Sequence, residues 1–170
     1  MNKIYEFVET ICTSLIIVCI CFAFFFRMVS VDGSSMNSTL SDNDKIILTY
    51  SHNIQRGDIV VTDNTNGSGK RLIKRVIAMG GDRIKIDFTM GEVYVNDELI
   101  NETYILEPMM QKDYILDITV RDGYLFLMGD NRNNSLDSRY DEIGLISKNE
   151  ILGKASVRLF PKFTVLKGDK

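Results

Sequence analysis

An uninterrupted apolar segment lies near the start of the chain. Residues 10–26, TICTSLIIVCICFAFFF, contain no charged side chain. As a helix they would measure about 25 Å, and Val8 together with a snorkelling Arg27 would extend them toward the ~30 Å of a bilayer core. A cleaved leader would end in small residues, whereas residues 24–26 are all phenylalanine. We therefore predict one transmembrane helix over residues 10–26 that stays on the protein.

Beyond residue 44 the apolar positions come in short runs separated by turn residues. This spacing favours a folded or closed antiparallel sheet over βαβ units. Asn96-Asp97 and Asp122-Gly123 predict hairpin turns, and residues 64–69 (NTNGSG) predict a flexible loop. Strands are expected over residues 45–50, 58–63, 71–78, 83–87, 92–95, 115–120, 124–128 and 151–160. The pattern predicts a mainly β, compact antiparallel domain that resembles a barrel.

The chain divides into three parts on this pattern. We predict a short amino-terminal segment over residues 1–9, the transmembrane anchor over residues 10–26 and a β-rich domain over residues 27–170. No internal repeat and no second domain-sized core is visible in the sequence. Charge does not orient the anchor, because one lysine or arginine stands close to each of its ends.

Composition excludes several classes of function. The net charge is −3 and no basic cluster occurs, so nucleic-acid binding is not expected. Cys12, Cys19 and Cys21 all lie in the apolar segment, which leaves the β-rich part without a disulfide. His52 is the only histidine, which disfavours a histidine-based zinc site. We therefore expect no metal and no cofactor.

The first segment that could carry chemistry is a turn a few residues beyond the anchor. Gly33-Ser34-Ser35 would leave backbone N–H groups exposed beside a hydroxyl, which suits a nucleophile with its own oxyanion donors. Taken by itself, the pattern is more typical of an ordinary serine-rich turn.

The second segment contains a lysine in a predicted strand. Strand periodicity places Lys74 on one face with Leu72, Val76 and Ala78, whereas Arg75 points the other way. A lysine in an apolar row is desolvated, which lowers its pKa and lets it act as a general base. Taken by itself, the pattern is more typical of a lysine at a strand edge that reaches to water.

The third segment is the loop over residues 129–139, GDNRNNSLDSR, which follows the predicted strand 124–128. It is dense in short hydrogen-bonding side chains, so it is either a solvated turn or a set of groups that orients catalytic side chains. Asp137 and Arg139 are spaced to form an ion pair within this loop.

Together and in this order, the three segments resemble the bacterial type I signal peptidases of the short Gram-positive kind. Ser35-Met36 matches the dipeptide that carries that family's nucleophile. Lys74-Arg75, followed by Gly81-Asp82, matches the pair that carries its general base. The loop 129–139 matches the family pattern GDNR-x-NS-x-DSR at every defined position. The resemblance covers nearly the whole chain.

The resemblance implies a role for each matched residue. Ser35 would attack the scissile carbonyl, and its backbone N–H would help to form the oxyanion hole. Lys74 would accept the proton, while Ser135 would hydrogen-bond the Lys74 amine and aim it. Asp137 and Arg139 would hold the loop. The walls of the pockets for small substrate side chains would be Val31, Met36, Leu40 and Ile73.

Three positions depart from the family pattern. Gly33 stands where some relatives carry a serine hydroxyl, so an oxyanion donor would have to come from backbone or water. Ser38 and Gly80 replace the usual prolines. Because proline fixes φ and glycine relaxes it, we expect both turns to be more flexible here.

The resemblance implies a membrane-anchored serine endopeptidase that removes signal peptides from secreted preproteins. Its partners would be those preproteins, membrane lipid and the neighbouring secretion channel. Its amino terminus would be cytoplasmic and its catalytic domain extracytoplasmic. Three alternatives stay open at this point: a signal peptidase restricted to one substrate class such as pilins, a self-cleaving Ser–Lys protease of the stress-response repressor type, and a catalytically silent membrane-anchored scaffold.

Overall fold

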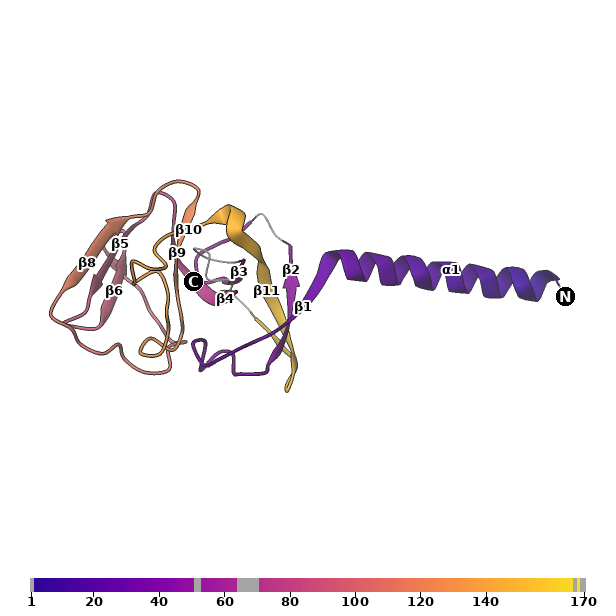
Figure 1. Ribbon diagram of the computed structural model, residues 1–170, viewed down its shortest axis with the longest axis horizontal. Coiled ribbons are helices and arrows are strands. Elements are labelled where there is room, and N and C mark those ends of the chain that lie inside the picture. Colours follow the sequence, from indigo (N-terminus) through magenta and orange to yellow (C-terminus); the bar gives the residue numbers. More distant parts are fainter. Residues whose placement is uncertain (1, 51–52, 64–70, 167, 169–170) are drawn as a thin grey trace.

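The computed structural model describes residues 2–50, 53–63, 71–166 and 168, without the side chains at positions 2 and 21–26. The predicted flexible loop over residues 64–69 and the single histidine, His52, lie outside this range. The described chain forms one helix at the amino terminus and a β-rich body beyond it (Figure 1).

The helix α1 (Asn2–Phe25) extends away from the β-rich body (Figure 1). It runs without a break through the predicted amino-terminal segment and most of the predicted anchor, and the strand β1 (Phe26–Ser30) follows it directly. Its charged side chains, Lys3, Glu6 and Glu9, lie before the apolar run over residues 10–26. Within the described residues, no helix is both long and apolar enough to cross a membrane. The predicted transmembrane helix over residues 10–26 is therefore not supported.

The larger sheet is antiparallel and curls into an open half-barrel (Figure 1). Its strands follow the order β1-β2-β11-β3-β4-β9-β10, with β12 paired to β11. Register shifts along β11 and between Val76 and Ala78 of β4 bend the strands, because a bulge increases local twist. The strands beyond β1 are β2 (Lys45–Thr49), β3 (Ile59–Thr62), β4 (Leu72–Met79), β9 (Tyr124–Met128), β10 (Ile146–Ser147), β11 (Ile151–Phe160) and β12 (Thr164–Val165).

The smaller sheet packs against the larger one and has the order β7-β6-β5-β8. Its strands are β5 (Arg83–Asp87), β6 (Glu92–Val95), β7 (Glu98–Leu99) and β8 (Ile115–Thr119). A core cluster with members from both sheets, such as Ile77 and Phe126 from one and Ile84 and Val93 from the other, joins them. The mainly β prediction is confirmed.

The two predicted hairpin turns have different outcomes. Asn96 and Asp97 adopt positive φ angles of 54° and 66° and connect β6 to its partner β7, as predicted. The Asp122-Gly123 hairpin is wrong, because β8 pairs with β5 whereas β9 pairs with β4 of the other sheet. That turn carries the chain between sheets. A turn signature reports local backbone geometry and does not determine which strands pair.

Candidate active site

The predicted nucleophile lies in a turn that two buried side chains hold in place. Met36 and Leu40 are 1% and 0% exposed, and the Leu40 N–H donates to the Met36 carbonyl at 2.8 Å. Gly33 has a φ of 87°, a conformation that favours glycine, and its N–H donates to Asp42 at 2.8 Å. The turn therefore presents Ser35 partly exposed on a buried base.

Lys74, from strand β4, lies directly against Ser35. Its Nζ donates to the Ser35 Oγ at 2.7 Å and to the Ile73 carbonyl at 3.1 Å. Lys74 is only 3% exposed. This burial lowers the pKa of the Lys74 amine from 10.5 to about 8, while the Asp137 carboxylate opposes the shift. An amine with that pKa can take the proton of the adjacent hydroxyl, so the pair is suited to nucleophilic catalysis.

Asp137 is the centre of the loop over residues 129–139. Its carboxylate, fully buried, accepts hydrogen bonds from the Gly129 N–H at 2.9 Å and from Arg139 Nε at 2.7 Å. The expected Asp137–Arg139 ion pair is thus present. Ser135 also donates to Asp137, at 2.7 Å, and not to the Lys74 amine as we expected. The Ser135 hydroxyl gives its one proton to the carboxylate two residues away, and the Lys74 amine donates to Ser35 and to the Ile73 carbonyl instead.

The loop also holds the nucleophile turn directly. The Asn131 N–H donates to the Ser35 carbonyl at 3.0 Å, and the Asn131 amide donates to the Ser34 carbonyl at 3.2 Å. The Asn134 amide donates to the Ser34 hydroxyl at 2.9 Å. Sequence reasoning did not assign these two asparagines a role. Their signal was the density of short polar side chains in the loop.

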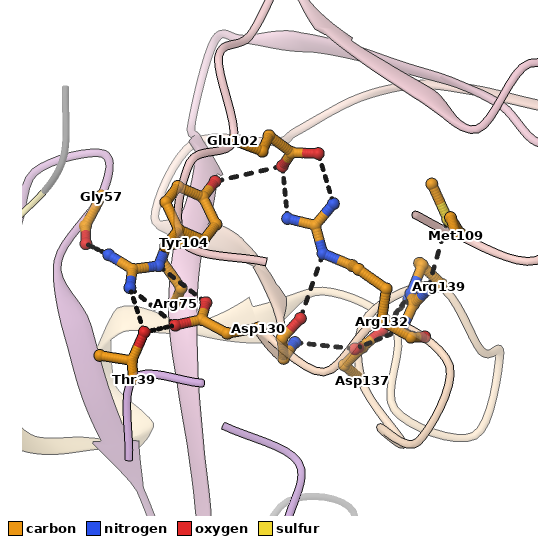
Figure 2. A network of polar contacts seen from close by, with 11 residues as sticks. Thr39, Gly57, Arg75, Glu102, Tyr104, Met109, Asp130, Arg132, Asp137 and Arg139 are labelled. Carbon is orange, nitrogen blue, oxygen red and sulfur yellow. Dashed lines mark hydrogen bonds and ion pairs between the residues drawn. The ribbon is translucent and has the colours of Figure 1, made fainter. Parts of the chain in front are cut away.

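A buried ion pair fixes the opposite face of β4. Arg75 and Asp130 are 1% and 0% exposed, and two hydrogen bonds of 2.8 and 2.7 Å join them (Figure 2). Arg75 also donates to the Gly57 carbonyl at 2.8 Å and to the Thr39 hydroxyl at 3.3 Å. Lys74 and Arg75 thus point to opposite faces, as predicted. Asp130 belongs to the loop of residues 129–139, so its ion pair with Arg75 anchors that loop to β4.

A groove of about 860 Å³ passes beside Ser35 and Lys74. Of the four residues that the resemblance implies for the pocket walls, Val31, Met36 and Ile73 line this groove, whereas Leu40 is fully buried beneath it in the same core cluster. The remaining lining residues, for which the sequence predicted no place in a pocket wall, are Met28, Val29, Ser30, Asp32, Gly33, Asp63, Arg71 and Leu72.

Strand edges border this groove on two sides. Among the described strands, β1 pairs only with β2, and residues 72–74 of β4 pair with β3 but not with β9. Four antiparallel steps separate β1 from β4, so both edges run in the same direction. Unpaired edges of this kind can accept an extended peptide as an additional strand. No cluster of three or more histidine, cysteine or acidic side chains that could hold a metal ion occurs within the described residues.

Comparison with known proteins identifies the family. The family model for signal peptidase, peptidase S26, matches residues 4–160. This chain belongs to the signal peptidase family. It is 30% identical to signal peptidase I of Bacillus licheniformis over 99% of this chain and 95% of that protein. It is 34% identical to signal peptidase I U of Bacillus subtilis (strain 168), over 81% of this chain and 77% of that protein.

A solved structure shares the fold of this signal peptidase family member. The crystal structure of a signal peptidase I from Enterococcus faecalis V583 superposes with a TM-score of 0.52 at 24% identity, covering 62% of this chain and 98% of that chain. The family match and the relatives together make the chain a peptidase.

The lowered pKa of Lys74 predicts the pH dependence of peptide cleavage. We expect kcat/KM to rise with pH and level off above an apparent pKa of about 8, because only the neutral amine accepts a proton. At pH 7 roughly a tenth of the enzyme would then hold a neutral lysine, against roughly 0.03% for a pKa of 10.5. Initial rates of cleavage of a short peptide, recorded between pH 6 and 10, give this pH dependence of kcat/KM. A limb near pH 6.5 that disappears in His52→Ala would instead assign the base to the histidine.

Proposed function

We propose that this peptidase removes signal peptides from secreted preproteins, with Ser35 as nucleophile and Lys74 as general base. The observation that carries the proposal is the 2.7 Å contact between the Ser35 hydroxyl and a buried Lys74 amine. A catalytically silent scaffold would have no use for a buried lysine in that place, because burial of the charge costs free energy.

The geometry supports a two-step hydrolysis. In the first step Ser35 Oγ bonds to the carbonyl carbon before the cut, and its proton passes to Lys74 Nζ. The peptide C–N bond then breaks, and the lysine returns that proton to the amine of the departing mature protein. In the second step Lys74 takes a proton from water, whose oxygen bonds to the ester carbonyl carbon. The ester C–O bond then breaks, and Lys74 returns that proton to Ser35 Oγ, which regenerates the free enzyme. The Ser35 N–H, which donates to no described residue, is free to face the oxyanion.

The groove suits an extended leader segment. A peptide placed between the edges of β1 and residues 72–74 would hydrogen-bond through its main chain, so recognition would depend little on sequence. Val31, Met36 and Ile73 would limit the size of the side chains that point into the wall. These residues would therefore select small side chains just before the cut and two positions earlier.

Location at a membrane is part of the proposal. Ser35 follows Arg27 by eight residues, a maximum reach of roughly 26–29 Å, which keeps the nucleophile close to α1. Apolar side chains of α1 such as Ile11, Leu15 and Ile16 are exposed and have no cover within the described chain. We propose that α1 holds the catalytic domain at the outer membrane face near the secretion channel, with the exposed apolar side chains of α1 in contact with membrane lipid.

Cleavage of a preprotein by the purified enzyme tests the function and its specificity. A preprotein with alanine just before the cut should be processed at one bond, which mass spectrometry of the products locates. Replacing that alanine by phenylalanine should suppress the rate about 5- to 160-fold, because overfilling a packed apolar pocket costs ~1–3 kcal/mol. Equal rates for alanine and phenylalanine would refute the small pocket. Processing confined to one class, such as pilins, would favour the substrate-restricted alternative.

A further inference from the structure

A short segment outside the family motifs contacts both halves of the active site. Residues 102–106, which we call the clasp segment, lie between β7 and β8 and belong to no strand. The sequence pattern assigned them no role. Their side chains and backbone reach the nucleophile turn, strand β4 and the loop over residues 129–139.

The strongest contact of the clasp segment is an ion pair. The Arg132 side chain is 1% exposed, and the Glu102 carboxylate, 9% exposed, accepts hydrogen bonds from both of its terminal nitrogens (Figure 2). The Nε of the same arginine donates to the Gly129 carbonyl at 3.1 Å. A buried guanidinium requires a charged partner. Glu102 therefore determines where Arg132 lies, and through it where the Gly129 peptide lies.

The position of Gly129 affects Ser35 directly. A Cβ atom built on Gly129 would come within 2.5 Å of the Ser35 carbonyl oxygen, so the two backbones are in contact. The Gly129 N–H is held by Asp137 on its other side. A shift of this peptide would move the nucleophile turn relative to Lys74. The chain of contacts thus runs from Glu102 through Arg132 and Gly129 to Ser35.

Three further contacts join the clasp segment to the site. The Tyr104 hydroxyl donates to Glu102 at 3.1 Å, and its ring covers the Arg75 guanidinium at 3.9 Å (Figure 2). The Leu106 N–H donates to the Asp130 carbonyl at 3.2 Å. The Ser38 hydroxyl donates to the Tyr104 carbonyl at 3.0 Å. The serine at position 38 thus supplies a hydrogen bond between the nucleophile turn and the clasp segment. The clasp segment therefore contacts the nucleophile turn as well as the loop.

We propose that Glu102 is a positioning residue for the Ser35–Lys74 pair, acting through Arg132 and the Gly129 peptide. The inference rests on the proposed function, because it assigns Glu102 a role in the reaction of that pair. Glu102 touches neither substrate nor the reacting atoms. Its effect should therefore appear in kcat more than in KM.

The test compares Glu102→Gln with the matched change Glu98→Gln in full-length enzyme in detergent. Glu98 is exposed on β7 and makes no ion pair within the described residues, so its variant should behave as wild type. Glu102→Gln should lower kcat per folded molecule about 10- to 100-fold, the effect of a misplacement near 1 Å, with KM changed less than about threefold. The substrate is a short peptide with small residues before the cut, and circular dichroism gives the folded fraction. A wild-type kcat would overturn the inference.

A double variant keeps the test decisive if Glu102→Gln does not fold. Glu102→Met combined with Arg132→Met removes both charges, and replacing a buried pair by apolar side chains is often tolerated. The Gly129 carbonyl still loses the hydrogen bond from Arg132, so kcat should again fall about 10- to 100-fold. A folded double variant with wild-type kcat would overturn the inference.

If Ser35→Ala or Lys74→Ala cleaves normally, the proposed function fails instead. If both are inactive while Glu102→Gln is normal, only the role of Glu102 fails.

Discussion

Ser35→Ala and Lys74→Ala should each lower the rate of peptide cleavage at least about 10⁴-fold while the β-rich body stays folded. The hydroxyl and the amine lie 2.7 Å apart and act as one unit, so loss of either removes the acylation route. The double variant should be no slower than the single ones, because members of such a unit are not additive.

Stability distinguishes loss of chemistry from loss of fold. Burial lowers the pKa of Lys74 from 10.5 to about 8, so below pH 8 the folded protein carries a charge that burial disfavours. Between about pH 8 and 10.5 the folded protein has lost the Lys74 proton while the unfolded chain still holds it. The free energy of unfolding therefore rises with pH over this range. The near-isosteric Lys74→Met should therefore be at least as stable as wild type at pH 7, which urea unfolding measures.

Ser34→Ala serves as the control for the nucleophile. Its hydroxyl accepts one hydrogen bond from Asn134, so its loss should reduce activity only modestly. The assignment of Ser35 would be wrong if Ser34→Ala were inactive while Ser35→Ala still cleaved. Peptide cleavage by all three variants, compared with their urea midpoints, decides between these outcomes.

Gly129→Ala should reduce kcat about 100-fold or more and destabilise the fold by ~1–3 kcal/mol. The added Cβ would lie 2.5 Å from the Ser35 carbonyl oxygen and would also collide with the Ser135 side chain. The carbonyl belongs to the backbone of the nucleophile turn, so the clash can be relieved only by moving Ser35 or the loop. Peptide kinetics corrected for the folded fraction measure the effect.

Gly144→Ala gives the matched control for this change. Gly144 has a φ of 58°, and a Cβ there would meet nothing nearer than 3.8 Å, so alanine adds backbone strain without a clash at the site. It should lower the urea midpoint and leave kcat per folded molecule unchanged. A normal kcat for folded Gly129→Ala would contradict the tight packing of Ser35 against the loop.

The strand content of the protein follows from the sequence because alternation is a local property. The burial of β2 and β5 alternates strictly along each strand, and the sequence shows that period directly. The Asn96-Asp97 turn is local for the same reason, since both residues tolerate positive φ. The apolar run over residues 10–26 is local as well, and α1 (Asn2–Phe25) runs through most of it.

The three segments with possible chemistry were also readable, because their residue types and order resemble a known family. The placement of Ser35, Lys74 and the loop in one site, however, depends on strands and turns that are far apart in the chain. Ser35 and Lys74 are 39 residues apart, and only the curl of the larger sheet brings them within hydrogen-bonding distance.

The hydrogen-bond and packing partners of individual side chains were decided by the tertiary structure alone. Ser135 donates to Asp137 and not to Lys74, and Leu40 packs in the core and not in the groove wall. Periodicity tells which face of a strand is buried, but not which atom from a distant segment will lie opposite. Whether two polar groups form a hydrogen bond depends on distances of tenths of an ångström. Those distances are fixed only when the whole chain is packed. The sequence therefore determined the strands, the family and the candidate residues, whereas packing decided the contacts that place them.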